Sequence, residues 1–449
     1  MLKKHPFVLG TFILTATGLL SRVMGFFYRM FLSQNIGEEG MGVYQLIAPI
    51  MALTFSLCSA GIQTAISKFV ANEPATHDYK TSQRFLLVGF FLSMFLSMIS
   101  CFFVFKNAAF IATHILLEKR CEPLLRIFAL SIPFASAHSC INGYYYGIKS
   151  TVIPSATQLI EQLIRVGSVY LICSYYIAHH ITIKISICVI GLILGEITSC
   201  MVSVVAISYR FYRRNTTLIF EKMSHYIMYG RKLTGIAIPI SLNRIVLNLL
   251  QSMEAIYIPN RLMMYGLSNE KVLSIYGVLT GMAIPLILFP TALTGSVSVL
   301  LLPYVAQSQE QQDAQRLGIA IKKSLTFALL LGFSCTVFFF ILGRFLGDFL
   351  FHSPLAGTFI MSMSFLCPFL YSGNILSSIL HGLGKAGSVF LYNCISLLIR
   401  LAFVFFAIPK FGISGYLWGL LVSEITLCGL YLHSLSSQQI FAITRRIHK

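Results

Sequence analysis

Two near-identical decapeptides, each inside a long apolar run, constrain the fold of this chain most strongly. They are GLILGEITSC at Gly191–Cys200 and GLLVSEITLC at Gly419–Cys428, which agree at six of ten positions and keep a glutamate. LIRVGSVYLI at Leu163–Ile172 precedes the first copy, and LIRLAFVFFA at Leu398–Ala407 precedes the second. Such repeats indicate a duplicated membrane bundle, and duplicated bundles are usually transporters whose substrate site lies between the repeats.

The composition places the chain in a lipid bilayer. Of its 449 residues, 56% are hydrophobic and 11% are charged, whereas a soluble domain carries about 25% charged residues. The net charge of +18 lies mainly in short loops, which is typical of membrane orientation rather than of nucleic-acid binding. The 11 cysteines have no metal-ligand spacing, so we expect neither a metal nor a cofactor. A coupling ion, H⁺ or Na⁺, remains open.

The apolar runs predict an all-α integral membrane protein with about 12 transmembrane helices, since a span needs about 20 apolar residues. We expect an N-lobe at 1–209 with helices 1–6, a basic cytoplasmic linker at 210–232, and a C-lobe at 233–449 with helices 7–12. The two lobes would be related by a pseudo-twofold axis around a central cavity. The expected spans are roughly 7–33, 41–70, 85–105, 124–148, 152–178, 181–209, 233–259, 273–306, 324–346, 356–383, 387–408 and 412–434.

The distribution of Lys and Arg predicts the orientation. If the N-terminus is cytoplasmic, the loops on that side hold most of the basic residues, so both termini are expected in the cytoplasm. The linker at 210–232 would then lie against anionic membrane lipids. No expected loop is long enough for a catalytic domain. An enzyme would need paired acidic residues on an outer loop, and Glu38-Glu39 is weak evidence for one.

Several arginines fall within the spans, where a buried cation costs roughly 2.5–3.5 kcal/mol. Arg22 and Arg29 are seven residues apart and share one face of the first helix. Leu20-Ser21-Arg22 is matched in the second half by Leu242-Asn243-Arg244. We interpret these stripes as the lining of a polar cavity, with structural salt bridges as the alternative. The remaining expected members of the cavity are Asn248, Gln251 and Glu254.

A second group of charged residues could couple transport to an ion or hold the helices together. Glu161 and Arg165 have the i, i+4 spacing of an ion pair on one helix. The repeat keeps the arginine as Arg400 but has no glutamate at the matching turn. Arg400 therefore faces the cavity or pairs with Glu424 or Glu196, the two repeat glutamates.

A cavity dominated by guanidinium groups prefers an anion, and the planar fork suits phosphate and pyrophosphate. The residues therefore favour an amphiphile with a phosphate-bearing head, whose head crosses the cavity while its tail stays in the bilayer. A cation antiporter would instead need carboxylates to dominate the same surface.

Five segments from both halves of the chain carry a known pattern in the same order. They are Ser21–Ile50, Ala60–Ala71, Ile141–Arg165, Ile275–Ala306 and HGLGKAGSV at His381–Val389. Through them the whole chain resembles the stage V sporulation protein B family of the multidrug/oligosaccharidyl-lipid/polysaccharide exporter superfamily. The resemblance implies two six-helix lobes that alternate between inward-open and outward-open states in a bacterial plasma membrane. It also implies flipping of undecaprenyl-pyrophosphate-linked saccharides such as lipid II or a polysaccharide precursor, possible action as a monomer, and no nucleic-acid partner.

The chain departs from related lipid II flippases at several positions. Arg22 matches their SRxxG motif, but Arg29 lies one residue later than their second arginine. Their Arg and Glu before a Phe-Pro are missing before Phe289-Pro290, and Glu254 stands where the sporulation-type pattern has aspartate. The saccharide lipid is thus left open. A cation-coupled multidrug antiporter of the same superfamily is the alternative function.

Overall fold

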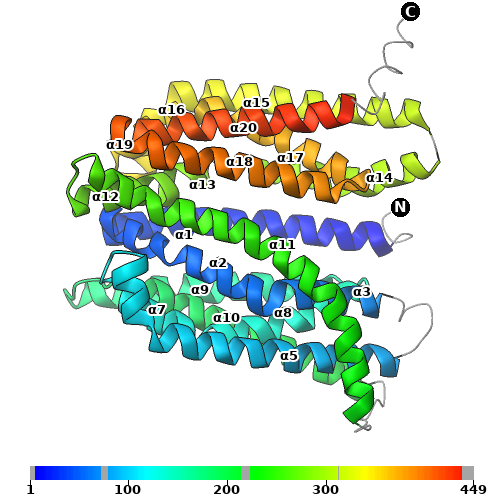
Figure 1. Ribbon diagram of the computed structural model, residues 1–449. Coiled ribbons are helices and arrows are strands. Elements are labelled where there is room, and N and C mark those ends of the chain that lie inside the picture. The colour runs from blue at the N-terminus through cyan, green and yellow to red at the C-terminus, as the bar shows by residue number, and fades with distance from the viewer. Residues whose placement is uncertain (1–5, 72–78, 214–222, 312, 437–449) are drawn as a thin grey trace, which may run out of the picture. The chain divides into compact units, whose positions relative to one another are not determined.

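The computed structural model describes residues 6–71, 79–213, 223–311 and 313–436. All regular secondary structure in these ranges is helical, as expected (Figure 1). Residues 214–222 of the expected linker lie outside the described ranges. The main helices are α1 (Pro6–Leu46), α2 (Ala48–Phe55), α3 (Gly61–Val70), α5 (Tyr79–Lys106), α7 (Cys121–Ala129), α8 (Ile132–Gly147), α9 (Val152–Ala178), α10 (Ser186–Arg213), α11 (Met223–Met264), α12 (Asn269–Gly277), α13 (Ile284–Leu288), α14 (Thr291–Glu310), α15 (Ala314–Phe351), α16 (Pro354–Met363), α17 (Cys367–Gly382), α18 (Ala386–Phe406), α19 (Ile408–Phe411) and α20 (Ile413–Ser436).

Among the described residues, nine helices are long and apolar enough to cross a membrane, or ten when the bent pair α7 and α8 counts as one span. The protein is therefore a multi-pass membrane protein. The expected number of 12 stays a prediction for two reasons. The stretch Ile13–Val70 counts as one span although the sequence predicted two. The helix α9 is missing from the nine, because its glutamate, glutamines and arginine lower its mean hydropathy.

The chain divides into two compact units whose limits fall inside long helices. Unit 1 comprises Met1–Tyr28 and Val43–Ser252, and unit 2 comprises Arg29–Gly42 and Met253–Lys449. Both α1 and α11 therefore contribute to both units. The expected lobes at 1–209 and 233–449 stay a prediction, and this division differs from them by assigning 233–252 to unit 1 and 29–42 to unit 2.

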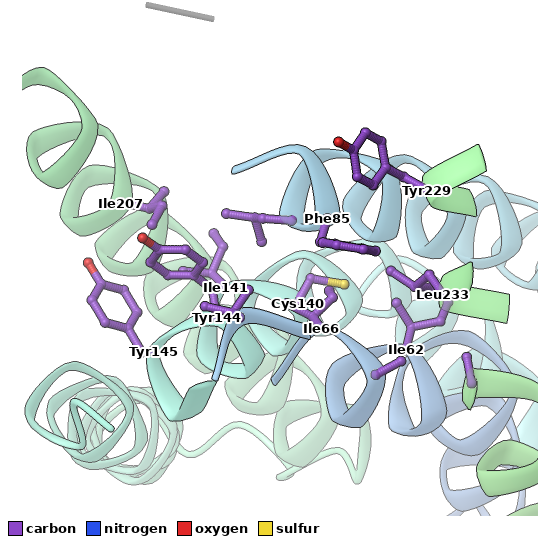
Figure 2. Packing of buried hydrophobic residues seen from close by; sticks show 14 residues of the cluster. Ile62, Ile66, Phe85, Cys140, Ile141, Tyr144, Tyr145, Ile207, Tyr229 and Leu233 are labelled. Carbon is purple, nitrogen blue, oxygen red and sulfur yellow. The ribbon is translucent and has the colours of Figure 1, made fainter. Parts of the chain in front are cut away.

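The first part of α11 is held in unit 1 by an apolar cluster shown in Figure 2. Tyr229 and Leu233 of α11 lie against Phe85 of α5 and Ile66 of α3. A Cβ placed at Gly89 would lie 2.6 Å from the Ile66 side chain and 3.3 Å from that of Leu233. Small residues allow such close helix packing in a bilayer, where apolar burial between helices adds little.

Hydroxyl groups link the helices of unit 1 at buried positions. The Ser93 hydroxyl on α5 donates to the Cys58 carbonyl oxygen at 2.6 Å. Ser59 donates to Ser136 on α8 at 3.0 Å. Such contacts between membrane helices contribute about 0.6 kcal/mol each on average, because the separated helices also find other hydrogen-bond partners.

The helix α1 is broken at Gly37, within the segment Arg29–Gly42 that belongs to unit 2. Gly37 has φ of 71° and ψ of −179°, a conformation that a side chain would strain. The next residue, Glu38, accepts hydrogen bonds from Ser274 on α12 and from Ser353, the N-cap of α16. In the sequence, Glu38 is weak evidence for an enzyme. In the structure its carboxylate links α1 to α12 and to the start of α16.

In the rest of unit 2, α15 packs against α16 and α17, α14 packs against α17, and α18 packs against α20. These are the yellow to red helices of Figure 1. Glycines permit the close approaches, since a Cβ at Gly332 on α15 would lie 2.5 Å from the Cα of Pro368 on α17. The buried Tyr371 hydroxyl donates to the carbonyl oxygen of Ile287 at 2.9 Å.

Two of the three π-helical segments in the described residues lie at matching places of the two halves. One spans Ser56–Ala60 between α2 and α3, and the other spans Val278–Ala283 between α12 and α13, while the third spans Ile111–Ile115 in unit 1. Val278 follows Ser56 by the same number of residues as Arg244 follows Arg22. Matched irregularities of this kind are what a duplicated chain predicts, and π-helical turns occur often at functional sites.

We expect Gly277→Ala to destabilise unit 2. A Cβ at Gly277 would collide with the Glu38 carbonyl oxygen and the Gly42 amide nitrogen, both of which are backbone atoms. Overpacking of this kind costs about 1–3 kcal/mol, so the midpoint of thermal unfolding in detergent should fall. The matched control is Gly295→Ala on α14, where a Cβ meets nothing within 4 Å. Equal unfolding temperatures for the two variants would contradict this packing.

Candidate functional site: two arginine centres

The charged centre of unit 1 is built around Arg165 on α9. Its Nη2 atom binds Oε1 of Glu161, one helical turn earlier, as the i, i+4 spacing predicts. The same Nη2 atom lies 3.7 Å from Oε1 of Glu196 on α10. All three side chains are largely buried, with exposed fractions of 21%, 16% and 15% for Arg165, Glu161 and Glu196.

The packing of α9 on α10 places Glu196 beside this ion pair. A Cβ at Gly191 would lie 3.0 Å from the Arg165 carbonyl oxygen, and one at Gly195 would lie 2.9 Å from that of Glu161. Both glycines precede the glutamate of the first decapeptide, and Gly195 is its direct neighbour. Their conservative replacement by alanine would push α10 away and separate Glu196 from Arg165.

His138 on α8 is a fourth member of the centre and was not predicted from the sequence. One ligand atom each of His138, Glu161 and Glu196 lies within 4.8 Å of the others. The Nδ1 atom of His138 lies 2.9 Å from the Ser199 hydroxyl on α10, which orients the ring. A lone histidine in an apolar run carries no spacing signal, so only the packing of α8 on α10 could reveal it.

The charged centre of unit 2 is built around Arg400 on α18. Glu254 on α11 accepts from Nε of Arg400 and from the Tyr416 hydroxyl on α20, both at 2.7 Å. Glu254 is 3% exposed. The sequence left the cavity, Glu424 and Glu196 as options for Arg400, and the structure identifies Glu254 as its direct partner.

In both centres a carboxylate neutralises the buried arginine. In unit 1 it comes from the arginine's own helix, α9, and in unit 2 it comes from another helix, α11. Ser396, one turn before Arg400, stands at the position that Glu161 occupies before Arg165. It is buried, and its hydroxyl lies 3.5 Å from the Ser423 carbonyl oxygen. With no glutamate on its own helix, Arg400 is paired by α11. The repeat glutamate Glu424 is also buried and interacts electrostatically with Arg400.

The residues that the sequence assigned to a cavity are divided between the units. Arg22, Arg244 and Gln251 are exposed in unit 1, where Asn248 donates to Ser56 and, at 3.4 Å, to the Ala52 carbonyl oxygen. The half-buried Arg29 and the buried Glu254 belong to unit 2. Their meeting in one cavity therefore stays a prediction.

Neither centre is suited to bind an anion, and within the described ranges only the centre of unit 1 has a group of residue types that can hold a metal. The carboxylates around Arg165 and Arg400 equal or exceed the guanidinium charge, so neither centre attracts an anion. The group of His138, Glu161 and Glu196 has ligand types that hold metals in other proteins, but Arg165 already occupies one carboxylate. Anion recognition by Arg22, Arg29 and Arg244 stays a prediction.

We expect Arg400→Leu to destabilise unit 2 strongly. The change leaves Glu254 buried without its cation, which typically costs about 3–5 kcal/mol. The double variant Arg400→Leu with Glu254→Leu removes both charges and should recover much of the loss. Thermal unfolding of the wild type and the three variants in detergent measures the coupling. Additive losses would contradict a direct pair.

The fold is shared with solved transporters of the MOP superfamily. An inward-facing multidrug resistance MATE family transporter superposes with a TM-score of 0.73 at 12% identity, over 94% of this chain and 96% of that one. A lipid II flippase MurJ superposes with a TM-score of 0.66 at 15% identity, over 96% of this chain and 87% of that one. At these identities the likeness concerns the fold alone.

Sequence comparison agrees with the resemblance described above. Stage V sporulation protein B of Bacillus subtilis (strain 168) is 27% identical over 451 residues, which cover 99% of this chain and 86% of that protein. The family model for polysaccharide biosynthesis proteins matches residues 7–309, more than half of the chain. The chain therefore belongs to the polysaccharide biosynthesis protein family.

Proposed function

We propose that this protein moves a polyprenyl-pyrophosphate-linked saccharide from the inner to the outer leaflet of a bacterial plasma membrane. The substrate is lipid II or a related polysaccharide precursor, and transport proceeds by alternating access. The polar head crosses the protein while the prenyl tail stays in the bilayer. Two lines of support are the membership of the family and the position of basic side chains within membrane-spanning helices.

The observation that carries the proposal is Arg244. It lies near the midpoint of the candidate span Tyr226–Met264. Its side chain is exposed and makes no hydrogen bond or ion pair within the part of the chain that the structure describes. A guanidinium facing hydrocarbon would cost several kcal/mol. Such a residue is stable where it faces water and meets an anion during the transport cycle.

The charge distribution supports an anionic head group over a cationic drug. Glu254, the acidic residue on the flank of the Arg244 stripe, is already bound to Arg400 and Tyr416. The carboxylates of Glu161 and Glu196 lie beside Arg165. These three acidic groups are thus engaged near arginines of their own. A guanidinium group repels an ammonium and attracts a pyrophosphate, and its fork can donate two parallel hydrogen bonds to phosphate oxygens.

The remaining expectations follow from this function. The protein acts as a transporter and not as an enzyme, and the Glu38 carboxylate accepts hydrogen bonds from Ser274 and Ser353. Both termini are cytoplasmic, as the basic loops predict. The partners are the lipid-linked saccharide and the surrounding lipids, with no nucleic acid, and the protein works as a monomer.

Reconstitution tests the proposal against its main alternative, the cation-coupled multidrug antiporter. Purified protein in vesicles is assayed with a labelled polyprenyl-pyrophosphate saccharide and, separately, with a cationic dye under an ion gradient. We expect translocation of the lipid and no accumulation or efflux of the dye. Dye transport without lipid translocation would establish the antiporter instead.

Arg22→Ala and Arg244→Ala should each weaken binding of the saccharide lipid. The loss of a hydrogen bond to a charged group is worth about 1.5–3 kcal/mol, so the Kd measured in nanodiscs should rise by about one to two orders of magnitude. The lysine variants keep the charge but lose the bidentate fork, so they should recover only part of the affinity.

Arg231→Ala is the matched control for Arg244→Ala. Arg231 is an exposed arginine on the same helix, more than three turns nearer the N-terminus. Its replacement should leave the Kd unchanged. If all three alanine variants weaken binding equally, a nonspecific effect of net charge would explain the result, and the arginine site would be wrong.

A further inference from the structure

We propose that the centre of unit 1 is a proton-binding site, in which Glu196 carries one exchangeable proton and His138 passes it on. The site itself is argued from the geometry of unit 1 alone. That the proton drives movement of the saccharide lipid rests on the proposed function.

The first argument is a count of charges. Two carboxylates, Glu161 and Glu196, lie beside the single guanidinium of Arg165. When both acids are ionised, the centre carries one surplus negative charge at a buried place. An unpaired buried charge is costly, and a proton is the smallest group that removes it.

The second argument identifies which acid is in surplus. Nη2 of Arg165 is hydrogen-bonded to Glu161 but lies 3.7 Å from Oε1 of Glu196, beyond hydrogen-bond reach. The other oxygen of Glu196, Oε2, is buried and has no hydrogen-bond partner in the described structure. A protonated carboxyl is neutral, so Glu196 can occupy this position without a second cation.

The third argument concerns access. Glu196 lines a cavity of about 380 Å³ in unit 1, between α2, α7, α8 and α10. Two hydroxyls of the lining are already bonded to backbone, since Thr54 donates to the Ile50 carbonyl oxygen at 2.9 Å and Ser131 to that of Phe128 at 2.7 Å. Glu196 is the only ionisable residue among those that line the cavity. The cavity is large enough for water, which could carry a proton to the carboxyl.

His138, on α8, lies beside the carboxyl of Glu196, on α10. The Ser199 hydroxyl holds Nδ1 at 2.9 Å, and one ring nitrogen lies within 4.8 Å of ligand oxygens of both acids. An imidazole can accept a proton at one nitrogen and release one from the other, which is why histidine serves in proton transfer. A water molecule between the ring and Glu196 would complete the path.

The surroundings of the centre contain few other groups that could hold the proton. Besides Glu161, Arg165 and His138, the neighbours are Cys200 next to Glu196, and Tyr28 and Tyr44 near Arg165. A phenol and a thiol are by nature weaker acids than a carboxyl, so they compete poorly with Glu196 as sites of proton exchange at physiological pH. A divalent metal would overcompensate the single surplus charge, because Arg165 would then face a site of net positive charge.

Infrared difference spectroscopy of the protein in nanodiscs tests the site without any substrate. Glu424 is a second buried carboxylate near Arg400 in unit 2, so the Glu196 and His138 variants are made and compared in a Glu424→Gln background. In buffer free of Na⁺, a step from low to high pH should remove the C=O stretching band of a buried protonated carboxyl in that background. Glu196→Gln should abolish that band, and His138→Gln should keep it while slowing its disappearance after the pH step.

Three results would overturn the proposal: no such band in the Glu424→Gln background, a band that persists when Glu196→Gln is added to it, or loss of the band at low pH when Na⁺ is added. The proposed function is tested separately in vesicles, where an imposed pH gradient should change the rate of lipid translocation in the wild type and not in Glu196→Gln. A positive spectrum with no lipid movement would contradict the proposed function and leave the proton site standing.

Discussion

Each unit of this protein depends on a guanidinium that must be neutralised within a membrane-spanning helix bundle. Arg165 and Arg400 occupy matching positions of the repeat, and the cost of leaving either unpaired in an apolar environment is several kcal/mol. The packing of α10 on α9 brings Glu196 to Arg165, and that of α20 on α18 brings Tyr416 to Arg400. The glycines, serines and repeat glutamates around these arginines hold the neutralising groups in position.

The two units reach the same end by different routes, and this difference assigns them different roles. In unit 2, Glu254 receives two hydrogen bonds at 2.7 Å and is almost fully buried, which describes a rigid structural pair. In unit 1, Glu196 lies on a cavity with one oxygen unpartnered, which describes a group able to change its protonation. The centre of unit 2 is thus a structural element, and the centre of unit 1 is the proposed site of energy coupling.

Much of the architecture could be predicted from the sequence, because apolar length and repeats are local signals. The helical class, the approximate positions of the spans and the Glu161–Arg165 pair were all predicted, and the structure confirms the helices and the pair. The partner of Arg400 was missed, because its glutamate comes from a helix far away in the sequence. His138 was missed because a single histidine has no pattern. The unit limits inside α1 and α11 were missed because composition does not change there.

The proposed transport depends on recognition of an anionic head group by Arg22, Arg29 and Arg244. The most direct test of this proposal is an experimental structure of the protein in nanodiscs with a bound polyprenyl-pyrophosphate saccharide. We expect the pyrophosphate to lie within hydrogen-bond distance of guanidinium groups from this set. A head group bound away from all three arginines, or held by carboxylates through a cationic moiety, would contradict the proposal.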